Sequence, residues 1–423
     1  MSQTDAVQPS ATVDACDMPS TPYDVALAEI LSNIEPISEF ERIPIREALH
    51  RVAAEDITAN SDVPGHRNSA MDGYACQFAD LSVTGDVSRL KLVGTSAAGS
   101  PYLGNLKSGE CIRIFTGGVV PDQLDTVVMQ EDCEKENEYV VTRRGHKKGQ
   151  HVRNAGEDIS AGEVAVHEGQ AIGMAELGLL ASVGCESILV KRTPKVAFCS
   201  TGDELRGVGE SLRTGDVYDS NRYTLFALLE RAHVLSIDLG VVRDNLDDTI
   251  ATLAKGAEEA DVIITTAGAS VGDSDFVRQA LETLGELKLW KVAMRPGRPL
   301  AFGKIKNSWF FGLPGNPVSV VVTFDKFVKP ALRKLKGENQ VKPLEISARC
   351  SNPIFKTPGR LEFQRGILSY DQDGQAVVET TGSQNSSVLT SMSKANCYIV
   401  LPLECGNVSA GQTVTVQPFK TEF

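Results

Sequence analysis

Apolar residues along this chain follow two different spacings, and the spacing changes several times between its two ends. Between residues 194 and 336, short apolar runs alternate with longer segments in which apolar residues recur every three or four positions. This alternation predicts a doubly wound α/β domain, which we assign to residues 192–337. The predicted strands are 196–199, 235–241, 262–266 and 308–311, and the predicted helices are 221–232, 246–259, 274–284 and 318–335.

Short strands are predicted on both sides of this domain. Residues 62–150 contain β-rich runs separated by turn residues, which predicts a small inserted β domain. Residues 338–423 predict a C-terminal β-barrel-like domain with a hairpin turn at 371–374. The runs lie at 90–93, 111–115, 126–130 and 139–142 in the inserted domain, and at 361–368, 376–380, 398–401 and 413–416 in the C-terminal one. The predicted fold class is therefore multidomain, α/β plus β.

The inserted domain interrupts an N-terminal domain that we expect to be discontinuous, made of residues 21–61 and 151–191. A helix should begin at Tyr23, because Thr21 is suited to cap it and Pro22 to occupy its first turn. Further helices are predicted at 46–54 and 174–181. Residues 1–20 have little to bury and predict a disordered tail.

Composition narrows the class of protein. The net charge of −13 and the lack of a basic stripe argue against nucleic acid as a partner. The nine cysteines are scattered, with no C-x-x-C, which favours reduced thiols over disulfides or a cysteine-ligated zinc. No segment is long and apolar enough for a membrane span or a signal peptide. We therefore expect a soluble, cytoplasmic protein.

Three predicted strands of the α/β domain end in turns rich in glycine and polar residues. Because parallel strands share one carboxyl edge, these turns should converge on one crevice, where glycines allow a phosphate to approach the backbone. The residues expected to bind this substrate are Ser200, Thr201, Gly202, Gly268, Ser270, Gly272, Pro314, Gly315, Asn316 and Pro317. Carboxylates in the same turns suit Mg²⁺ bridging to a phosphate, and the candidate metal ligands are Asp203, Glu204, Asp273 and Asp275. Helix capping and ordinary turn structure are the alternative explanation of the same residues.

Basic and hydroxyl side chains elsewhere suggest an anionic ligand. Arg295 and Arg298 lie just before the last strand of the α/β domain, and arginine forks suit oxyanions. In the last domain, Arg360 and the serines around Ser386 could surround a tetrahedral oxyanion, although loop solubility explains them equally well. By their local sequence alone, the turns that contain Asp72, Thr116 and Asp158 are turns of the β domain rather than sites.

Taken in order, these segments resemble one family. NSAMDGYA (68–75), RIFTGG (113–118), GEDIS (156–160), STGDEL (200–205), YDSNR (218–222), ASVGDSDF (269–276), RPGRP (295–299), SWFFGLPGNPVS (308–319) and TPGRLEFQRG (357–366) follow one another along the chain. The sequence closely resembles the molybdopterin molybdenumtransferases, the bacterial homologues of the gephyrin E domain. The resemblance extends from Thr21 to Phe419.

This resemblance implies a four-domain homodimer that inserts molybdate into adenylylated molybdopterin. It also implies cleavage of the pyrophosphate, dependent on Mg²⁺ or another divalent cation, with release of AMP. The inserted domain of one subunit would face the crevice of the other. The implied partners are a separate molybdopterin adenylyltransferase and the molybdoenzymes, or their chaperones, that accept the product.

The family's functional positions fall on specific residues of this chain. Its catalytic acid and hydroxyl positions match Asp72, Thr116, Asp158, Glu204, Asp244 and Asp275. Lys291 matches a substrate-binding position, and the molybdate-binding positions match Arg295, Arg298, Ser319, Arg360 and Ser386. The chain departs from the usual pattern at Arg295 and Arg298, where lysines are common, and at Ala267 and Ala269, which replace a glycine and a valine.

Two other functions are compatible with such a chain. It could be a molybdopterin carrier or scaffold without catalysis, although the acids of the family are intact. It could catalyse the adenylylation itself, but it has a single predicted domain of the doubly wound type and no fused adenylyltransferase. Insertion of molybdate is therefore the function that the sequence predicts.

Overall fold

The computed structural model describes residues 20–82, 86–142, 145–267, 276–339 and 342–419. The chain divides into two compact units. The first unit is made of Met1–Glu39 together with Lys191–Phe423, and the second unit is Phe40–Val190. Within the described residues, no helix is both long enough and apolar enough to cross a membrane.

The centre of the first unit is a mixed sheet, which has six strands in the described residues, in the order β16-β13-β17-β21-β20-β18. The first four are mutually parallel, as predicted, whereas β20 runs antiparallel to β21 and β18 antiparallel to β20. The strands are β13 Lys195–Thr201, β16 Leu235–Val242, β17 Val262–Thr266, β18 Gly285–Lys291, β20 Pro299–Ile305 and β21 Ser308–Leu313. Strands β18 and β20 were not predicted from the sequence. Their glycines, Gly285 and Gly303, are not turn residues: a Cβ at either position would overlap a carbonyl oxygen of the neighbouring strand.

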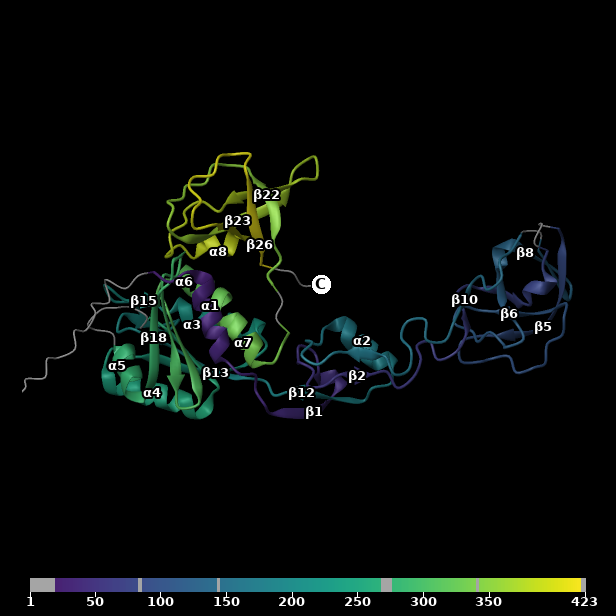
Figure 1. Ribbon diagram of the computed structural model, residues 1–423, viewed down its shortest axis with the longest axis horizontal. Helices are drawn as coiled ribbons and strands as arrows, with labels where there is room; N and C mark the ends of the chain where they lie inside the picture. Colours follow the sequence, from purple (N-terminus) through teal and green to yellow (C-terminus); the bar gives the residue numbers. More distant parts are fainter. Residues whose placement is uncertain (1–19, 83–85, 143–144, 268–275, 340–341, 420–423) are drawn as a thin grey trace, which may run out of the picture. The chain divides into compact units, whose positions relative to one another are not determined.

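Helices cover both faces of this sheet (Figure 1). Alternate residues of β13 separate the two cores: Val196 and Phe198 pack with α1, α3, α6 and α7, whereas Ala197 packs with α4 and α5. The helices are α1 Tyr23–Asn33, α3 Ser220–Arg231, α4 Leu246–Glu259, α5 Phe276–Leu284, α6 Pro317–Thr323 and α7 Lys329–Leu335. The short strands β14 Leu205–Arg206 and β15 Val217–Tyr218 pair with each other beside the sheet.

Helix α1 belongs to the first unit, which differs from the sequence assignment of residues 21–39 to the N-terminal domain. The buried Ala26 and Ile30 place it in the core of the α/β domain. Thr21 does not cap the helix as expected. Instead it forms a parallel bridge with Val292, and Pro22 occupies the capping position without a side-chain bond.

The long helix predicted at 318–335 contains a π-helical turn, Phe324–Val328, between α6 and α7. Pro330 explains the irregularity, because it has no N–H to donate to the carbonyl of Lys326 four residues earlier. The hydroxyl of Tyr23 donates to that carbonyl at 3.4 Å. Burial raises the pKa of the Tyr23 hydroxyl well above its ordinary value, so it remains a donor at any physiological pH.

The C-terminal part of the first unit is a closed barrel, which confirms the β-barrel-like prediction. Its described strands are joined in the order β23-β24-β22-β26-β25, and β25 pairs back to β23. The elements are β22 Ile346–Cys350, β23 Leu361–Tyr370, β24 Ala376–Thr380, α8 Thr390–Lys394, β25 Cys397–Leu401 and β26 Thr413–Pro418. A short strand of the α/β domain, β19 Met294–Arg295, adds to β23 in parallel. The arginine-containing loop is thereby attached to the barrel.

The second unit contains a β sheet and a smaller α/β part. In its described residues the sheet has the order β7-β4-β6-β5-β9-β8. The elements are β1 Phe40–Pro44, η1 Ile45–Glu47, β2 Ile57–Thr58, β3 Asn68–Ser69, β4 Gly73–Cys76, η2 Phe78–Asp80, β5 Ser88–Ser96, β6 Glu110–Ile114, β7 Thr126–Met129, η3 Gln130–Asp132, β8 Cys133–Glu136, β9 Tyr139–Thr142, β10 Val152–Arg153, β11 Val164–Val166, α2 Met174–Ser182 and β12 Ser187–Lys191.

The helix predicted at 46–54 is wrong. Only a 3₁₀ turn, Ile45–Glu47, forms there, because His50 adopts a positive φ of 65° that ends helical geometry. Val52 and Ala53 then form antiparallel bridges with Ala171 and Val190. The apolar residues of this segment are thus buried by strand-like pairing.

Candidate functional site

The predicted crevice edge lies where β13, β17 and β21 end. In the parallel register, Ser200 of β13 pairs with Thr266 of β17, and Thr266 pairs with Leu313 of β21. The turn after β21 approaches the turn after β17, since a Cβ on Gly315 would lie 3.7 Å from the Cβ of Ala267. The ends of β13, β17 and β21 therefore share one edge of the sheet, as predicted, while most of the turn after β17 lies outside the described residues.

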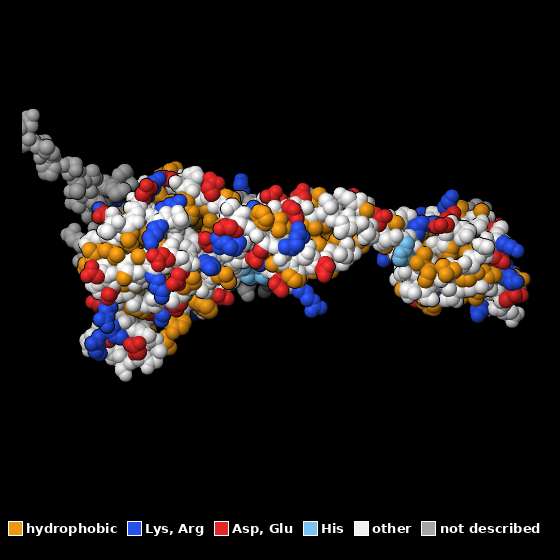
Figure 2. Space-filling model, turned by 90° about the horizontal axis from the view of Figure 1, so that it is seen from below, with side chains coloured by type: hydrophobic (Ala, Val, Ile, Leu, Met, Phe, Trp, Pro, Cys, Tyr) orange, Lys and Arg blue, Asp and Glu red, His pale blue; other side chains and the backbone are white. Residues whose placement is uncertain are grey.

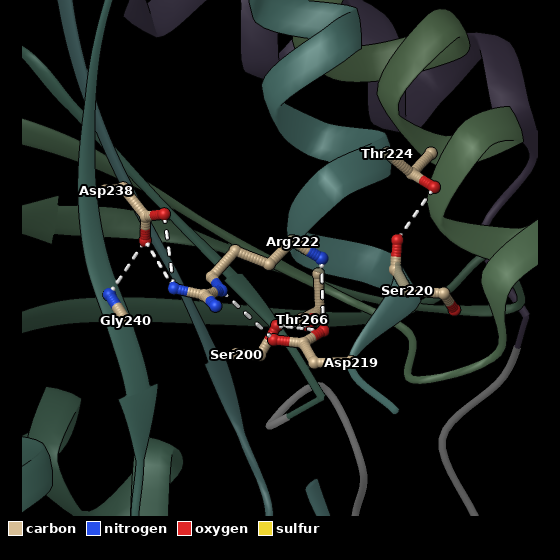
Figure 3. Close-up of polar contacts among 8 residues, drawn as sticks. All are labelled: Ser200, Asp219, Ser220, Arg222, Thr224, Asp238, Gly240 and Thr266. Carbon is tan, nitrogen blue, oxygen red and sulfur yellow. Dashed lines mark hydrogen bonds and ion pairs between the residues drawn. The ribbon is translucent and has the colours of Figure 1, made fainter. Parts of the chain in front are cut away.

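A buried polar network lies directly beneath this edge (Figure 3). The Ser200 hydroxyl donates to Asp219 Oδ1 at 3.0 Å and accepts from the Thr266 hydroxyl at 2.9 Å. Ser200 has no exposed surface, and Thr266 is 2 % exposed. The Ser200 hydroxyl, expected to contact substrate, is thus occupied inside the protein.

Helix α3 is fastened to the edge by the residues that begin it. Asp219 caps the helix by accepting the backbone N–H of Arg222 at 3.1 Å, and its Oδ2 lies 3.3 Å from Arg222 Nε. Asn221 donates from Nδ2 to the carbonyl of Gly315 at 2.7 Å. The start of α3 therefore holds the turn at residues 314–317, which includes the expected substrate contacts Pro314, Asn316 and Pro317.

Carboxylates gather at the ends of β13 and β16. The backbone N–H of Asp203 donates to Asp244 Oδ2 at 3.3 Å, and the backbone N–H of Asp244 donates to Asp203 Oδ1 at 3.2 Å. The Glu204 carboxylate folds against Gly202, where a Cβ would overlap it. This set of exposed carboxylate oxygens fits a hard divalent cation such as Mg²⁺. Within the described ranges, no three acidic, His or Cys side chains already form a metal-binding cluster.

Five expected site residues lie outside the described residues: Gly268, Ser270, Gly272, Asp273 and Asp275. The segment before them carries one departure from the family pattern. Ala267 has a φ of 68°, a left-handed conformation that favours glycine. A glycine, which the resemblance leads us to expect at this position, would adopt this conformation without strain.

Replacing Ala267 by glycine is expected to stabilise the protein. A non-glycine residue in the left-handed region costs about 1–2 kcal/mol, which the substitution relieves. The greater freedom of glycine in the unfolded chain offsets about half of this stabilisation. We expect Ala267→Gly to raise the free energy of unfolding by about 0.5–1 kcal/mol, measured by urea denaturation. A lower stability of the variant would show that the left-handed conformation is not strained.

Two of the segments that carry residues expected to bind molybdate contact helix α6. Gly297 packs so closely on this helix that a Cβ would overlap Thr323 Cγ2 and lie 3.8 Å from the Ser319 carbonyl oxygen. The loop between Arg295 and Arg298 is thereby held against α6. From the barrel, the Ser386 carbonyl accepts the backbone N–H of Val318 at 3.0 Å.

The flanking basic residues have different surroundings. Arg295 Nη1 lies 3.8 Å from Oε1 of the buried Glu362, while Arg298 donates to the Ser20 hydroxyl at 3.4 Å. Lys291 ends β18 and is half-buried, whereas Arg360 is exposed just before β23. Arg295 and Ser386 lie on segments that contact α6, Ser319 lies within this helix and is only 3 % exposed, and Arg360 is at the surface.

Sequence reasoning missed Arg365, the largest fully buried side chain, which is 1 % exposed. Its guanidinium donates to the Ser391 hydroxyl at 3.0 Å and to the carbonyls of Ser383 and Asn385 at 3.4 and 3.2 Å. Burial, with a smaller contribution from Arg295, lowers the pKa of Arg365 to about 10. It keeps its charge at neutral pH, and in the described part of the chain no carboxylate forms an ion pair with it. Strand alternation was the available signal, because Arg365 stands two positions after the core residue Phe363.

In the second unit, Asp72 and Thr116 are brought together. Asp72 Oδ1 accepts both the backbone N–H and the hydroxyl of Thr116, each at 2.8 Å. These two bonds, with a contribution from Arg113, lower the pKa of Asp72 below its ordinary value. The contact therefore contributes stability at pH values above the ordinary pKa of an aspartate, and this contribution is lost as the pH falls through the lowered value. Asp158 is exposed in a separate turn.

Thr116→Val is expected to raise the pKa of Asp72 part of the way back to its ordinary range. The substitution removes the hydroxyl donor but keeps the backbone donor, which has the larger effect. Titration of the Asp72 carboxyl carbon by NMR measures the change, and Thr95→Val in β5 serves as a control. An unchanged titration curve would contradict the assigned cause.

Three family models match this chain in order. The "MoeA N-terminal region (domain I and II)" matches residues 21–184, the "Probable molybdopterin binding domain" matches 197–334, and the "MoeA C-terminal region (domain IV)" matches 347–419. The chain is 41 % identical over 400 residues to the molybdopterin molybdenumtransferase of Haemophilus influenzae, covering 94 % of this chain and 98 % of that protein.

The chain belongs to the MoeA family of molybdopterin molybdenumtransferases. The MoeA fold is equally clear in three dimensions: a crystal structure of the molybdopterin biosynthesis moeA protein from Pyrococcus horikoshii superposes with a TM-score of 0.81 at 28 % identity, covering 95 % of this chain and all of that one. Gephyrin of Dictyostelium discoideum is 34 % identical over 446 residues and aligns with 93 % of this chain, although the match covers only 61 % of gephyrin.

Proposed function

We propose that this MoeA-family transferase inserts molybdate into the dithiolene of adenylylated molybdopterin, with release of AMP, as the last step of molybdenum cofactor biosynthesis. The observation that carries the proposal is the arrangement around α6. The Arg295–Arg298 loop and the Ser386 loop both contact this helix, Ser319 is buried within it, and the cation of Arg365 donates to the Ser383 and Asn385 carbonyls of the Ser386 loop. A tetrahedral dianion needs such a set of cationic and hydroxyl donors.

The substrate phosphate would lie at the adjoining strand-end edge. Thr201, Gly202 and the turn at residues 314–317 provide close backbone approach, while Lys291 and the arginines supply positive charge. Helix α6, whose Pro317 occupies the first turn, begins directly from the turn at residues 314–317. The two anions would thus be held on neighbouring elements of one rigid domain, which positions them for transfer.

Asp203, Glu204 and Asp244, together with Asp273 and Asp275, would hold a divalent cation. When bound, the cation would neutralise charge on the pyrophosphate and its leaving group. The reciprocal backbone bonds between Asp203 and Asp244 keep these two carboxylates in place. The preference for Mg²⁺ is part of the proposal.

A homodimer is also part of the proposal. The resemblance to the family puts Asp72, Thr116 and Asp158 of one copy at the crevice of the other. An apolar surface on the first unit is available for an interface: a hollow of about 580 Å³ is lined by Val208, Tyr218, Tyr223, Ala227, Leu228 and Leu389 among others. Val208, Tyr218 and Tyr223 are 67, 46 and 52 % exposed.

The proposed partners are a separate molybdopterin adenylyltransferase and the molybdoenzymes or their chaperones, in the cytoplasm. Nucleic acid is not proposed as a partner. Figure 2 shows acidic and basic side chains interspersed over the face drawn, and the net charge of the chain is −13. Crosslinking with the adenylyltransferase tests the first partner, and absence of any complex would count against it.

The function is tested by incubating the purified protein with adenylylated molybdopterin, Mg²⁺ and molybdate. AMP release and molybdenum-loaded cofactor are followed together. We expect molybdate-dependent AMP release with one loaded cofactor for each AMP. Tight substrate binding without turnover would replace the proposal by a carrier or scaffold function.

A further inference from the structure

In the hydrogen bonds beneath the strand ends, Thr266 donates to Ser200 and Ser200 donates to Asp219. A carboxylate can only accept, so Ser200 must donate its proton to Asp219 Oδ1. With its proton committed, Ser200 accepts from the hydroxyl of Thr266. The orientation of both hydroxyls is therefore set by the carboxylate of Asp219 (Figure 3).

The position of Asp219 is fixed by Arg222 of α3, which also contacts Asp238 of β16. The side chain of Asp219 is 1 % exposed and lies 3.3 Å from Arg222 Nε. Arg222 Nη1 also lies 3.2 Å from Asp238 Oδ2, and Asp238 Oδ1 accepts the backbone N–H of Gly240 at 2.8 Å. The paired guanidinium compensates the buried carboxylate, which can therefore remain beneath a site for an anion.

The members of this chain of bonds are too deeply buried to touch a ligand. Ser200, Thr266 and Asp219 are 0, 2 and 2 % exposed. The next residues along the two strands, Thr201 and Ala267, are half-buried and lie at the edge. The Thr201 hydroxyl donates to the Thr266 carbonyl at 3.4 Å, so displacement of one strand end would move the other.

We propose that Asp219 is a positioning residue for the substrate crevice and acts through Ser200 and Thr266. By fixing both hydroxyls, it holds the carboxyl ends of β13 and β17, and thus Thr201 and Ala267, at the spacing that the substrate phosphate requires. This inference rests on the proposed function, because it takes the ligand of the edge to be adenylylated molybdopterin.

Ser200→Ala and Thr266→Val test the proposal, since each removes one hydroxyl and adds no bulk. We expect each to raise the KM for adenylylated molybdopterin about tenfold, because small displacements of positioning groups have effects of this size or larger. The double variant should be no worse than the more affected single variant, because both interrupt the same chain of bonds. Asp219→Asn, which keeps an acceptor for the helix cap but loses the charge, should change KM in the same direction.

Rescue and control variants separate positioning from general destabilisation. Thr266→Ser restores the hydroxyl and should return KM to near the wild-type value. Ser308→Ala is the matched control: Ser308 is 1 % exposed and donates to the carbonyl of Ala260 at 2.6 Å, at the opposite end of β21. It should leave KM unchanged. Additive effects in the double variant, or failure of Thr266→Ser to restore KM, would overturn the proposal.

The same variants also distinguish positioning by Asp219 from direct contact between Ser200 and the substrate, and from failure of the proposed function. If the Ser200 hydroxyl bound substrate itself, Ser200→Ala alone would raise KM, and Thr266→Val would not. Calorimetric titration of the same variants with adenylylated molybdopterin measures binding without turnover. Wild-type binding without AMP release would refute the proposed function, whereas wild-type Kd values in Ser200→Ala and Thr266→Val would refute the positioning role.

Discussion

Replacing Arg365 by methionine is expected to raise the KM for molybdate by roughly thirtyfold. A hydrogen bond to a charged group contributes about 2 kcal/mol, and this substitution removes the cation together with its bonds to the Ser383 and Asn385 carbonyls. The loop that carries Ser386 then loses its anchor, and a neutral side chain occupies the base of the proposed molybdate site. The KM for adenylylated molybdopterin should change much less. Steady-state AMP release at varied molybdate measures the first constant, and AMP release at varied adenylylated molybdopterin measures the second.

Two further variants define what Arg365 does. Arg349→Met is the control, because Arg349 is a barrel arginine that is 53 % exposed and pairs with Asp371 at the surface; its KM for molybdate should be that of the wild type. Arg360→Met should also raise the KM for molybdate if the exposed Arg360 binds this anion. An unaltered molybdate KM in Arg365→Met, with the protein folded, would show that Arg365 is only a structural member of the barrel.

Glu204→Gln is expected to lower AMP release by about two orders of magnitude while leaving substrate binding nearly unchanged. Loss of one preorganised electrostatic group typically costs a factor of 10² to 10³ in turnover. Glutamine keeps the shape of the side chain that packs on Gly202 but removes the negative charge that a divalent cation needs. The AMP release rate at varied Mg²⁺ and the affinity for Mn²⁺, measured by electron paramagnetic resonance, should both decrease.

The Mn²⁺ measurement keeps this test independent of turnover. Glu230→Gln provides a control, because Glu230 is an exposed carboxylate near the end of α3 in the same domain. It should alter neither Mn²⁺ affinity nor turnover. Wild-type AMP release by Glu204→Gln at limiting Mg²⁺ would remove Glu204 from the metal site.

Much of the fold follows from local patterns in the sequence, and the errors occur where distant residues decide local structure. The parallel strands and the helices α3 and α4 have clear periodicity and were predicted within a few residues. Strands β18 and β20 were not predicted, and their glycines, Gly285 and Gly303, permit a close contact between strands that meet only in the folded protein. The helix predicted at 46–54 does not form, because Val52 and Ala53 pair with Ala171 and Val190 in spite of the helical spacing of their apolar neighbours.

The candidate site could be located from the sequence more readily than its members could be assigned. Glycine-rich strand ends identified the edge, but they could not show that the Ser200 hydroxyl is occupied by Asp219 and Thr266, which lie 19 and 66 residues away in the chain. Arg365 was missed because a buried arginine is rare, and the partners that satisfy it are carbonyls of a loop. Burial and the direction of a hydrogen bond depend on tertiary structure.

The bond between Tyr23 and the Lys326 carbonyl has a consequence for synthesis of the protein, because it joins residues 303 positions apart. The ribosome produces α1 long before α7, so the apolar side of α1 must wait until the α/β domain has emerged. The second unit, which is continuous in the chain, has all of its residues available much earlier. A fragment that begins at Lys191 would leave uncovered the core surface on which Ala26 and Ile30 pack, and we expect such a fragment to aggregate unless α1 is supplied to it.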